Sequence, residues 1–208
     1  MIIERYALGP LAANAYLLVE SDAAVVVDPG GDPGPLLRAL AAHGAQLAAV
    51  WLTHADFDHV GGLAALVRAW PVPVHLHPAD LPLLRGAASQ AALFGVPIEP
   101  PPDTTVDLTD GQTLELAGTR ARCLHTPGHT PGHVAFYLPG ADAVLSGDAL
   151  FRGSIGRTDR PFGDGALLVR SIREQLLTLP DDTRVLPGHG PETTILTERG
   201  SNPFLAGR

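Results

Sequence analysis

Residues 52–62, with the sequence LTHADFDHVGG, carry two histidines and two aspartates within six positions: His54, Asp56, Asp58 and His59. Imidazole and carboxylate groups together bind divalent transition metals, with imidazole suiting Zn and Fe and carboxylate favouring harder ions such as Mn and Fe. The chain has a single cysteine, so a closed structural zinc site built from thiolates is not expected. The segment therefore predicts a reactive metal site.

Three further segments place metal-binding side chains directly after apolar runs. They are HTPGHTPGH at 125–133, LSGDALF at 145–151 and LPGHGP at 186–191, and they contribute His129, Asp148 and His189. The carboxyl ends of strands are where open α/β sheets usually hold their sites. The seven side chains exceed the needs of one four-coordinate ion, so two ions that share a carboxylate are the economical arrangement.

The elements that must position these residues alternate between strands and helices. The sequence predicts strands at 2–7, 14–20, 23–28, 46–52 and 72–77, helices at 35–43 and 59–70, and a surface loop from Gly86 to Asp103 that could border a site. A second run of strands is predicted at 112–116, 120–124, 133–138, 143–145 and 183–186, with an amphipathic helix at 166–179. The expected fold class is α/β, a four-layer α/β/β/α sandwich of two mixed sheets with outer helices. We expect one domain over residues 1–208, without a separate C-terminal helical substrate domain.

Composition narrows the class of protein. The 208 residues are 45% hydrophobic and 17% charged, which is ordinary for a globular enzyme. The formal net charge is −8 and all 14 basic residues are arginine, so a nucleic-acid partner is not expected. The sequence predicts neither a secretory signal nor a membrane-spanning segment, and it favours a cytoplasmic protein that acts on a small molecule. The oligomeric state is left open.

The motifs in their order along the chain resemble the metallo-β-lactamase superfamily. They are VVVDPGG, THADFDHVGG, HTPGHTPGH, SGDALFRGSIGRTD and LPGHGPETT…ER…NPF, and they extend from residue 25 to residue 204. Within the superfamily, the short bacterial glyoxalase II-like hydrolases, similar to hydroxyacylglutathione hydrolase, give the best match. Each motif alone would be weak, and the joint pattern is specific.

The resemblance implies a role for each residue. It places His54, Asp56 and His129 on a first metal ion, Asp58, His59 and His189 on a second, and Asp148 between them. A metal-bound hydroxide would attack the carbonyl of a thioester such as a hydroxyacyl-glutathione, or of a related ester, and Asp58 would orient or deprotonate this nucleophile. Asp28 is expected to anchor the ligand loops without binding metal, and Arg157 is a candidate substrate-binding residue.

Asp56 departs from the family pattern, which has a third histidine at this position. The resemblance favours two zinc ions, whereas a carboxylate adds a negative charge and a hard oxygen donor that favour Fe or Mn. Two alternatives to hydrolysis stay open: a non-haem iron oxidoreductase such as a persulfide dioxygenase, and a weakly active descendant that only binds a ligand. The remaining histidines and the cysteine are expected to be structural: His43, His75, His77, His125, His133 and Cys123.

Overall fold

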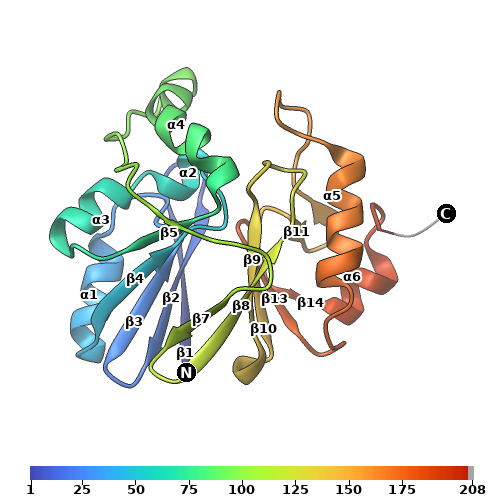
Figure 1. The fold of residues 1–208 in the computed structure, drawn as a ribbon, viewed down its shortest axis with the longest axis horizontal. Helices are drawn as coiled ribbons and strands as arrows, with labels where there is room; N and C mark the ends of the chain where they lie inside the picture. Colours follow the sequence, from blue (N-terminus) through green and yellow to red (C-terminus); the bar gives the residue numbers. More distant parts are fainter. Residues whose placement is uncertain (206–208) are drawn as a thin grey trace. The chain divides into compact units, whose positions relative to one another are not determined.

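The computed structural model describes residues 1–205, and these divide into two units. The first unit comprises Met1–Leu108 with the short segment Glu115–Thr119, and the second comprises Thr109–Leu114 with the chain from Arg120 onward. Each unit contains one mixed sheet with its own helices, and each is described separately below (Figure 1).

The first unit is built on a six-stranded sheet with the order β1-β2-β3-β4-β5-β6. The first three strands pair antiparallel and the following pairs are parallel, so the sheet is mixed. Both faces of its central strands are buried, which explains the continuous apolar runs LLV and AVVV. The strands are β1 (Ile2–Leu8), β2 (Ala13–Glu20), β3 (Ala23–Val27), β4 (Gln46–Trp51), β5 (Val74–Leu76) and β6 (Val106–Asp107).

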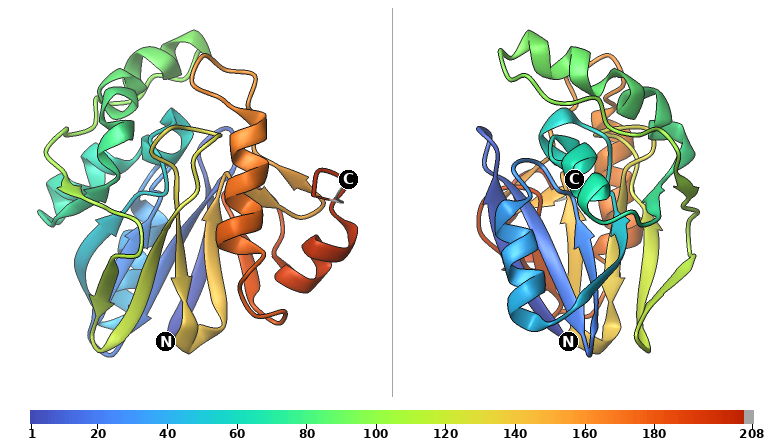
Figure 2. Two further views of the ribbon diagram at one scale, coloured as in Figure 1. Left: turned by 45° about the vertical axis from the view of Figure 1, so that its right-hand side comes forward. Right: turned by 90° about the vertical axis from the view of Figure 1, so that its left-hand side faces the viewer.

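The helices of the first unit pack over one face of this sheet, as Figures 1 and 2 show. They are α1 (Gly34–His43), α2 (Phe57–Val60), α3 (Leu63–Ala69) and α4 (Leu81–Leu93), with a 3₁₀ turn at Pro78–Asp80. Leu36 and Leu40 of α1, together with Leu66 of α3, join Leu17 and Val26 of the sheet in one core. Gly44 ends α1 in the left-handed conformation, as its position after the apolar helix predicts.

The second unit is built on a six-stranded mixed sheet with the order β14-β13-β10-β9-β8-β7. The neighbours β10 and β13 are parallel, whereas β8, β9 and β10 run antiparallel in succession. The strands of this sheet are β7 (Thr113–Leu116), β8 (Thr119–His125), β9 (Val134–Leu138), β10 (Ala143–Gly147), β13 (Arg184–Pro187) and β14 (Thr193–Thr194). A small hairpin, β11 (Leu150–Phe151) with β12 (Ser154–Ile155), follows β10.

Two helices complete the second unit. Helix α5 (Gly165–Ser171) continues into a π-helical segment (Ile172–Leu176), and α6 (Ile195–Ser201) follows β14. Asp164 caps α5 by accepting the Leu167 N–H at 2.9 Å. Leu168, Ile172 and Leu176 pack on sheet residues such as Val144 and Val185.

The predicted fold class is confirmed: two mixed sheets, each with flanking helices. The prediction of a loop over residues 86–103 is wrong at its start, because α4 extends to Leu93. Its alanine-rich sequence favours a helix, and only the proline-rich part beyond it is irregular. The predicted helix at 59–70 is two helices, because the chain turns at Gly61 and Gly62. Short elements with weak sequence patterns were not predicted: β6, β11, β12, β14 and α6.

Among the described residues, no helix has both the length and the hydrophobicity needed to cross a membrane.

Candidate metal centre

In the first unit, the predicted ligands lie at the carboxyl end of the parallel strands β3 and β4. Strand β4 ends at Trp51, the chain then passes His54 and Asp56 in a loop, and α2 begins at Phe57. Parallel neighbours end at the same edge of a sheet, which brings Asp28, after β3, to the same place. All of these site residues are buried, the most accessible being Asp58 at 8%.

The four predicted ligands of the first unit form two imidazole–carboxylate pairs, His54 with Asp56 and His59 with Asp58. His54 Nε2 lies 3.7 Å from Asp56 Oδ2, and His59 Nε2 lies 3.9 Å from Asp58 Oδ2. Two ligands bound about 2.1 Å from one ion at tetrahedral angles would stand roughly 3.4 Å apart, close to these separations. Each pair can therefore contribute two ligands to one ion with a small adjustment of side chains.

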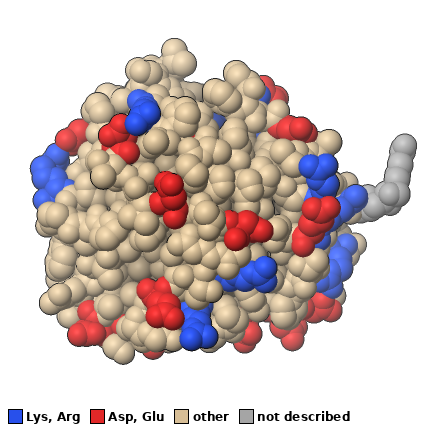
Figure 3. Space-filling model, in the orientation of Figure 1, with Lys and Arg blue, Asp and Glu red and all other residues tan. Residues whose placement is uncertain are grey.

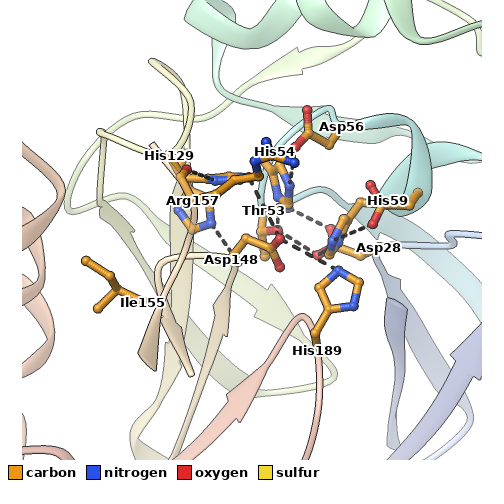
Figure 4. A network of polar contacts seen from close by, with 12 residues as sticks. Asp28, Thr53, His54, Asp56, His59, His129, Asp148, Ile155, Arg157 and His189 are labelled. Carbon is orange, nitrogen blue, oxygen red and sulfur yellow. Dashed lines mark hydrogen bonds and ion pairs between the residues drawn. The ribbon is translucent and has the colours of Figure 1, made fainter. Parts of the chain in front are cut away.

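A neighbouring group contacts the Nδ1 atom of each of the two histidines. The Nδ1 atom of His54 lies 2.9 Å from Thr53 Oγ1, and that of His59 lies 3.1 Å from Asp28 Oδ2. These residues are drawn in Figure 4. In metal-binding histidines, a partner at one ring nitrogen fixes the orientation of the ring and leaves the other nitrogen to the metal.

Asp28 contacts both Thr53 and His59 through its carboxylate. Its Oδ1 accepts the Thr53 N–H at 2.8 Å, and its Oδ2 accepts the Thr53 hydroxyl at 2.6 Å as well as facing His59. Its backbone has φ of 51°, a conformation that aspartate adopts more readily than most residues. The carboxylate is thus occupied by contacts that hold Thr53 and His59 in place.

Glycines let the anchoring loop approach α2 closely. A Cβ atom on Gly30 would lie 1.9 Å from the Asp58 carbonyl oxygen, and one on Gly62 would lie 1.8 Å from the Gly31 oxygen. Both distances are far below any tolerated contact. The close packing of this loop beside α2 therefore requires glycine at positions 30 and 62, within the PGG and VGG segments.

The second unit brings its own three predicted ligands together around one carboxylate oxygen. Asp148 Oδ2 lies 3.8 Å from His129 Nε2 and 3.7 Å from His189 Nε2. Asp148 follows β10 and His189 follows the parallel strand β13, whereas His129 lies in the turn between β8 and β9. This geometry is suited to a carboxylate that serves two ions, one with each histidine.

Backbone groups orient this second cluster. His129 Nδ1 donates to the Arg157 carbonyl oxygen at 2.8 Å, and His133 Nε2 accepts the Asp148 N–H at 3.0 Å. The other ring nitrogen of His133 lies 2.8 Å from Thr126 Oγ1. His133 is fully buried and supports the Asp148 backbone, which is consistent with the structural role expected of it.

Arg157 contacts His129 through its backbone carbonyl, whereas its guanidinium group contacts Asp159. The side chain makes a two-pronged contact with Asp159, at 2.8 Å and 2.9 Å, in an exposed position. This contact lowers the pKa of Asp159 to about 2. A substrate-binding role for Arg157, expected from the resemblance, would require the guanidinium to be shared with Asp159.

The donor set fits divalent metal ions. The first unit buries three carboxylates, Asp28, Asp56 and Asp58, beside two histidines, and the second buries Asp148 between two more. Burying carboxylates is costly unless positive charge or hydrogen bonds compensate them. A metal ion supplies that charge, and the imidazole nitrogens facing the carboxylates complete its ligands.

Two features of the first unit were not predicted from the sequence. Gln90 of α4 donates to Asp56 Oδ1 at 3.0 Å, although its segment was expected to be a loop. A pocket of about 370 Å³ borders Asp58, with walls that include Phe57, Ala65 and Ile98. The Gln90 contact has no local sequence signal, since it depends on where α4 packs. The pocket itself was not predicted, but Ile98 lies in the segment that was expected to border a site.

Two mixed sheets with flanking helices, and imidazole and carboxylate groups gathered at the strand ends, define a metal-binding α/β protein. Comparison with known families is specific: the metallo-β-lactamase superfamily model matches residues 8–189. The probable metallo-hydrolase YqgX of Bacillus subtilis is 42% identical over 98% of this chain and 97% of its own length. The hydroxyacylglutathione hydrolase GloC of Haemophilus influenzae is 40% identical over 99% and 98%, respectively. The chain belongs to the metallo-β-lactamase superfamily.

Solved structures agree with this assignment. The BLEG-1 B3 metallo-β-lactamase is 39% identical, with a TM-score of 0.92 over 99% of this chain and all of that chain. A protein designated TTHA1623, solved in a di-iron-bound form, is 48% identical with a TM-score of 0.90, over 97% of this chain and all of its own. These similar proteins include both a lactamase and an iron-containing form, so family membership leaves substrate and metal open.

Proposed function

We propose that this protein is a metal-dependent hydrolase of the glyoxalase II-like type, which cleaves a thioester such as a hydroxyacyl-glutathione, or a related ester, into an acid and a thiol or alcohol. The observation that carries the proposal is the arrangement around Asp148, where one carboxylate oxygen faces two imidazole nitrogens at 3.7 Å and 3.8 Å. The similarity to GloC over nearly the whole chain supports the thioester as substrate.

The proposed centre uses the ligands of both units. His54, Asp56 and His129 would hold one ion, Asp58, His59 and His189 the other, and Asp148 would bridge them. The family model, which covers all seven residues within 8–189, supports this assignment. When bound, two divalent ions would lower the pKa of a water molecule and act as Lewis acids toward the substrate carbonyl.

The chain's own residues have defined tasks in this proposal. Asp58, whose carboxylate is the most accessible in the first cluster, would orient or deprotonate the nucleophile. Asp28, Thr53 and His133 hold ligands in place through the hydrogen bonds described above. The pocket of about 370 Å³ beside Asp58 offers room for the acyl group.

The decisive measurement is hydrolysis of S-lactoylglutathione by protein loaded separately with Zn, Mn and Fe. We expect turnover with at least one metal and its loss in Asp58→Asn, while Asp22→Asn, at an exposed position in the turn between β2 and β3, retains activity. Absence of turnover with all three metals would contradict the substrate assignment.

Iron chemistry is the second candidate. It is favoured by Asp56, which places a carboxylate beside His54, and by the similarity to a protein solved with two irons. An iron-dependent oxidoreductase would consume oxygen with glutathione persulfide when loaded anaerobically with Fe(II). Oxygen consumption without thioester hydrolysis would replace the first proposal with this one.

We propose a small-molecule substrate and no nucleic-acid partner. On the face drawn in Figure 3, basic side chains lie among acidic ones and form no continuous band. Nucleic-acid binding requires such a band to neutralise phosphates.

A further inference from the structure

Gln90 makes two hydrogen bonds to consecutive residues at the start of α2. Its Nε2 donates to Asp56 Oδ1 at 3.0 Å, and its Oε1 accepts the Phe57 N–H at 2.8 Å. Gln90 is half-buried on α4, and α2 and α4 pack directly against each other. One amide therefore connects a helix of apolar sequence to the loop that carries Asp56.

The Phe57 N–H determines which way the amide faces. A backbone N–H requires an acceptor, so the amide oxygen takes that side and the NH₂ group must point at the carboxylate. The reverse orientation would set the amide oxygen against the Asp56 oxygen and the NH₂ against the N–H. The amide is thus committed to donate to Asp56.

Gln90 satisfies the first N–H of α2, that of Phe57. Asp56 is the N-cap residue of α2, where an aspartate side chain usually accepts the N–H of the second or third helical residue, yet it makes no capping bond. Its carboxylate lies instead between Gln90 and His54.

The two oxygens of Asp56 are thereby given different tasks. Oδ1 accepts from Gln90, while Oδ2 lies 3.7 Å from His54 Nε2, the separation that one ion can bridge. A carboxylate held in this way presents Oδ2 to a metal, and the hydrogen bond to Oδ1 disfavours chelation through both oxygens.

We infer that Gln90 is a positioning residue that makes Asp56 a one-oxygen ligand and so sets the affinity and metal preference of the ion bound beside His54. The inference rests on the proposed metal centre. It treats Asp56 and its hydrogen-bond partner Gln90 as a functional pair that replaces a histidine at position 56. Hydrogen-bond partners of metal ligands typically change metal affinity by roughly 10–100-fold when removed.

The test compares Gln90→Met, Gln90→Glu and the control Gln112→Met. Gln112 is also half-buried, and its amide oxygen accepts the Thr109 N–H at 3.0 Å. Gln112→Met therefore removes a similar amide contact away from Asp56. Dissociation constants for both ions are measured by competition with a chromophoric chelator, using Zn(II), Fe(II) and Co(II). The visible absorption of the Co(II) protein reports its coordination.

We expect Gln90→Met to raise the dissociation constant of one of the two ions by about tenfold and to change the visible absorption spectrum of the Co(II) protein. Gln90→Glu should weaken it further, because a second carboxylate would face Asp56. The control should match the parent in both measurements. Unchanged constants and an unchanged spectrum in Gln90→Met would overturn the inference.

The double variant Gln90→Met/Asp56→His separates positioning from a general structural effect. When a metal-bound histidine replaces Asp56, its other ring nitrogen carries a proton and offers the Gln90 NH₂ no acceptor. The loss caused by Gln90→Met should then shrink to less than twofold. An undiminished loss would show that Gln90 acts through the fold, which would contradict the inference.

These measurements use no substrate, so they stand apart from the proposed reaction. A protein that binds two ions with the expected dependence on Gln90 but hydrolyses no thioester would contradict only the proposed function. A parent protein that binds neither ion would contradict the metal centre and this inference together.

Discussion

Asp56 is the residue at which this chain differs from the histidine pattern of its superfamily, and its surroundings suit a ligand. The carboxylate is 2% exposed, faces His54 through one oxygen and accepts from Gln90 through the other. A hard oxygen donor with a negative charge favours Fe or Mn over Zn relative to imidazole.

Replacing Asp56 by histidine should therefore shift metal preference toward Zn. After dialysis against equal concentrations of Zn and Fe(II) under anaerobic conditions, elemental analysis should give a Zn-to-Fe ratio at least about fivefold higher than in the parent. The matched control is Asp22→His, which changes an exposed aspartate in the turn between β2 and β3. If the metal ratio of Asp56→His equals that of the parent, Asp56 is not a ligand.

Cys123 illustrates a reactive residue type that the fold makes inert. Burial is the main cause that raises the pKa of its thiol to about 12, with the charge of Asp110 adding to the effect. The native protein should therefore resist labelling by a disulfide reagent at pH 8, where about one thiol in ten thousand is ionised, and should label fully when denatured.

The same shift gives a sign for the pH dependence of stability. Because the folded pKa lies above the unfolded one, the thiol's contribution is complete below pH 9 and is lost as the pH rises toward 12. Cys123→Ala should flatten this part of the stability curve in chemical denaturation. Rapid labelling of the native protein at pH 8 would contradict both expectations.

At the scale of elements, a buried glutamate clamps the β11–β12 hairpin to α6. Glu198 accepts from the Gly153 N–H at 2.9 Å, from the Thr193 hydroxyl at 2.7 Å and from the Asn202 side chain at 2.8 Å. Asn202 also donates to the Ser154 carbonyl oxygen. This network accounts for the ER…NPF motif, and it supports the segment whose Arg157 carbonyl accepts from His129.

Removing this clamp should destabilise the protein more than removing an exposed acid. Glu198→Ala leaves two buried side-chain donors, those of Thr193 and Asn202, and the Gly153 N–H without this acceptor, and we expect a loss of about 3 kcal/mol in the free energy of unfolding. Glu192→Ala, which removes an exposed partner of Arg184, should cost less than about 1 kcal/mol. Urea denaturation measures both, and equal losses would contradict the clamp.

Gly62 and Gly86 differ in the space available for a side chain, so replacing each by alanine should have opposite effects on stability. Gly62→Ala should cost about 3 kcal/mol or more and lower metal affinity, since its Cβ would lie 1.8 Å from the Gly31 oxygen beside α2. Gly86→Ala, inside α4, meets nothing within 4 Å and should stabilise by about 0.5–1 kcal/mol. Thermal denaturation of the two variants should shift in opposite directions, and a shared direction would contradict this packing.

At the scale of the whole molecule, bound metal should be a major source of stability, because both units bury carboxylates at the proposed centre. A ligand present at a thousand times its dissociation constant stabilises a protein by about 4.1 kcal/mol per site. Exhaustive dialysis against a chelator should therefore lower the melting temperature, and adding back Zn or Fe(II) should restore it. An unchanged melting temperature would argue that no ion is held by the folded protein.

Much of the fold and of the candidate site follows from the sequence. The apolar runs of β2, β3 and β4, the glycine that ends α1 and the ligand motifs after strands were all readable, because they depend on local chemistry and spacing. Single-domain organisation stays a prediction, as does the assignment of ligands to two particular ions. The α4 helix was missed because the prolines that follow it outweighed its alanine-rich sequence.

The sequence by itself determined the kinds of ligand, their order and the family, since these depend on residue type and position along the chain. Only the tertiary structure decided which partner each ligand has: Asp28 with His59, His133 with Asp148, and Gln90 with Asp56. These partners lie 15 to 34 positions apart, and a hydrogen bond depends on distance and angle in space. The sequence shows that position 56 is an aspartate. The contacts of its carboxylate depend on how α4 packs on α2.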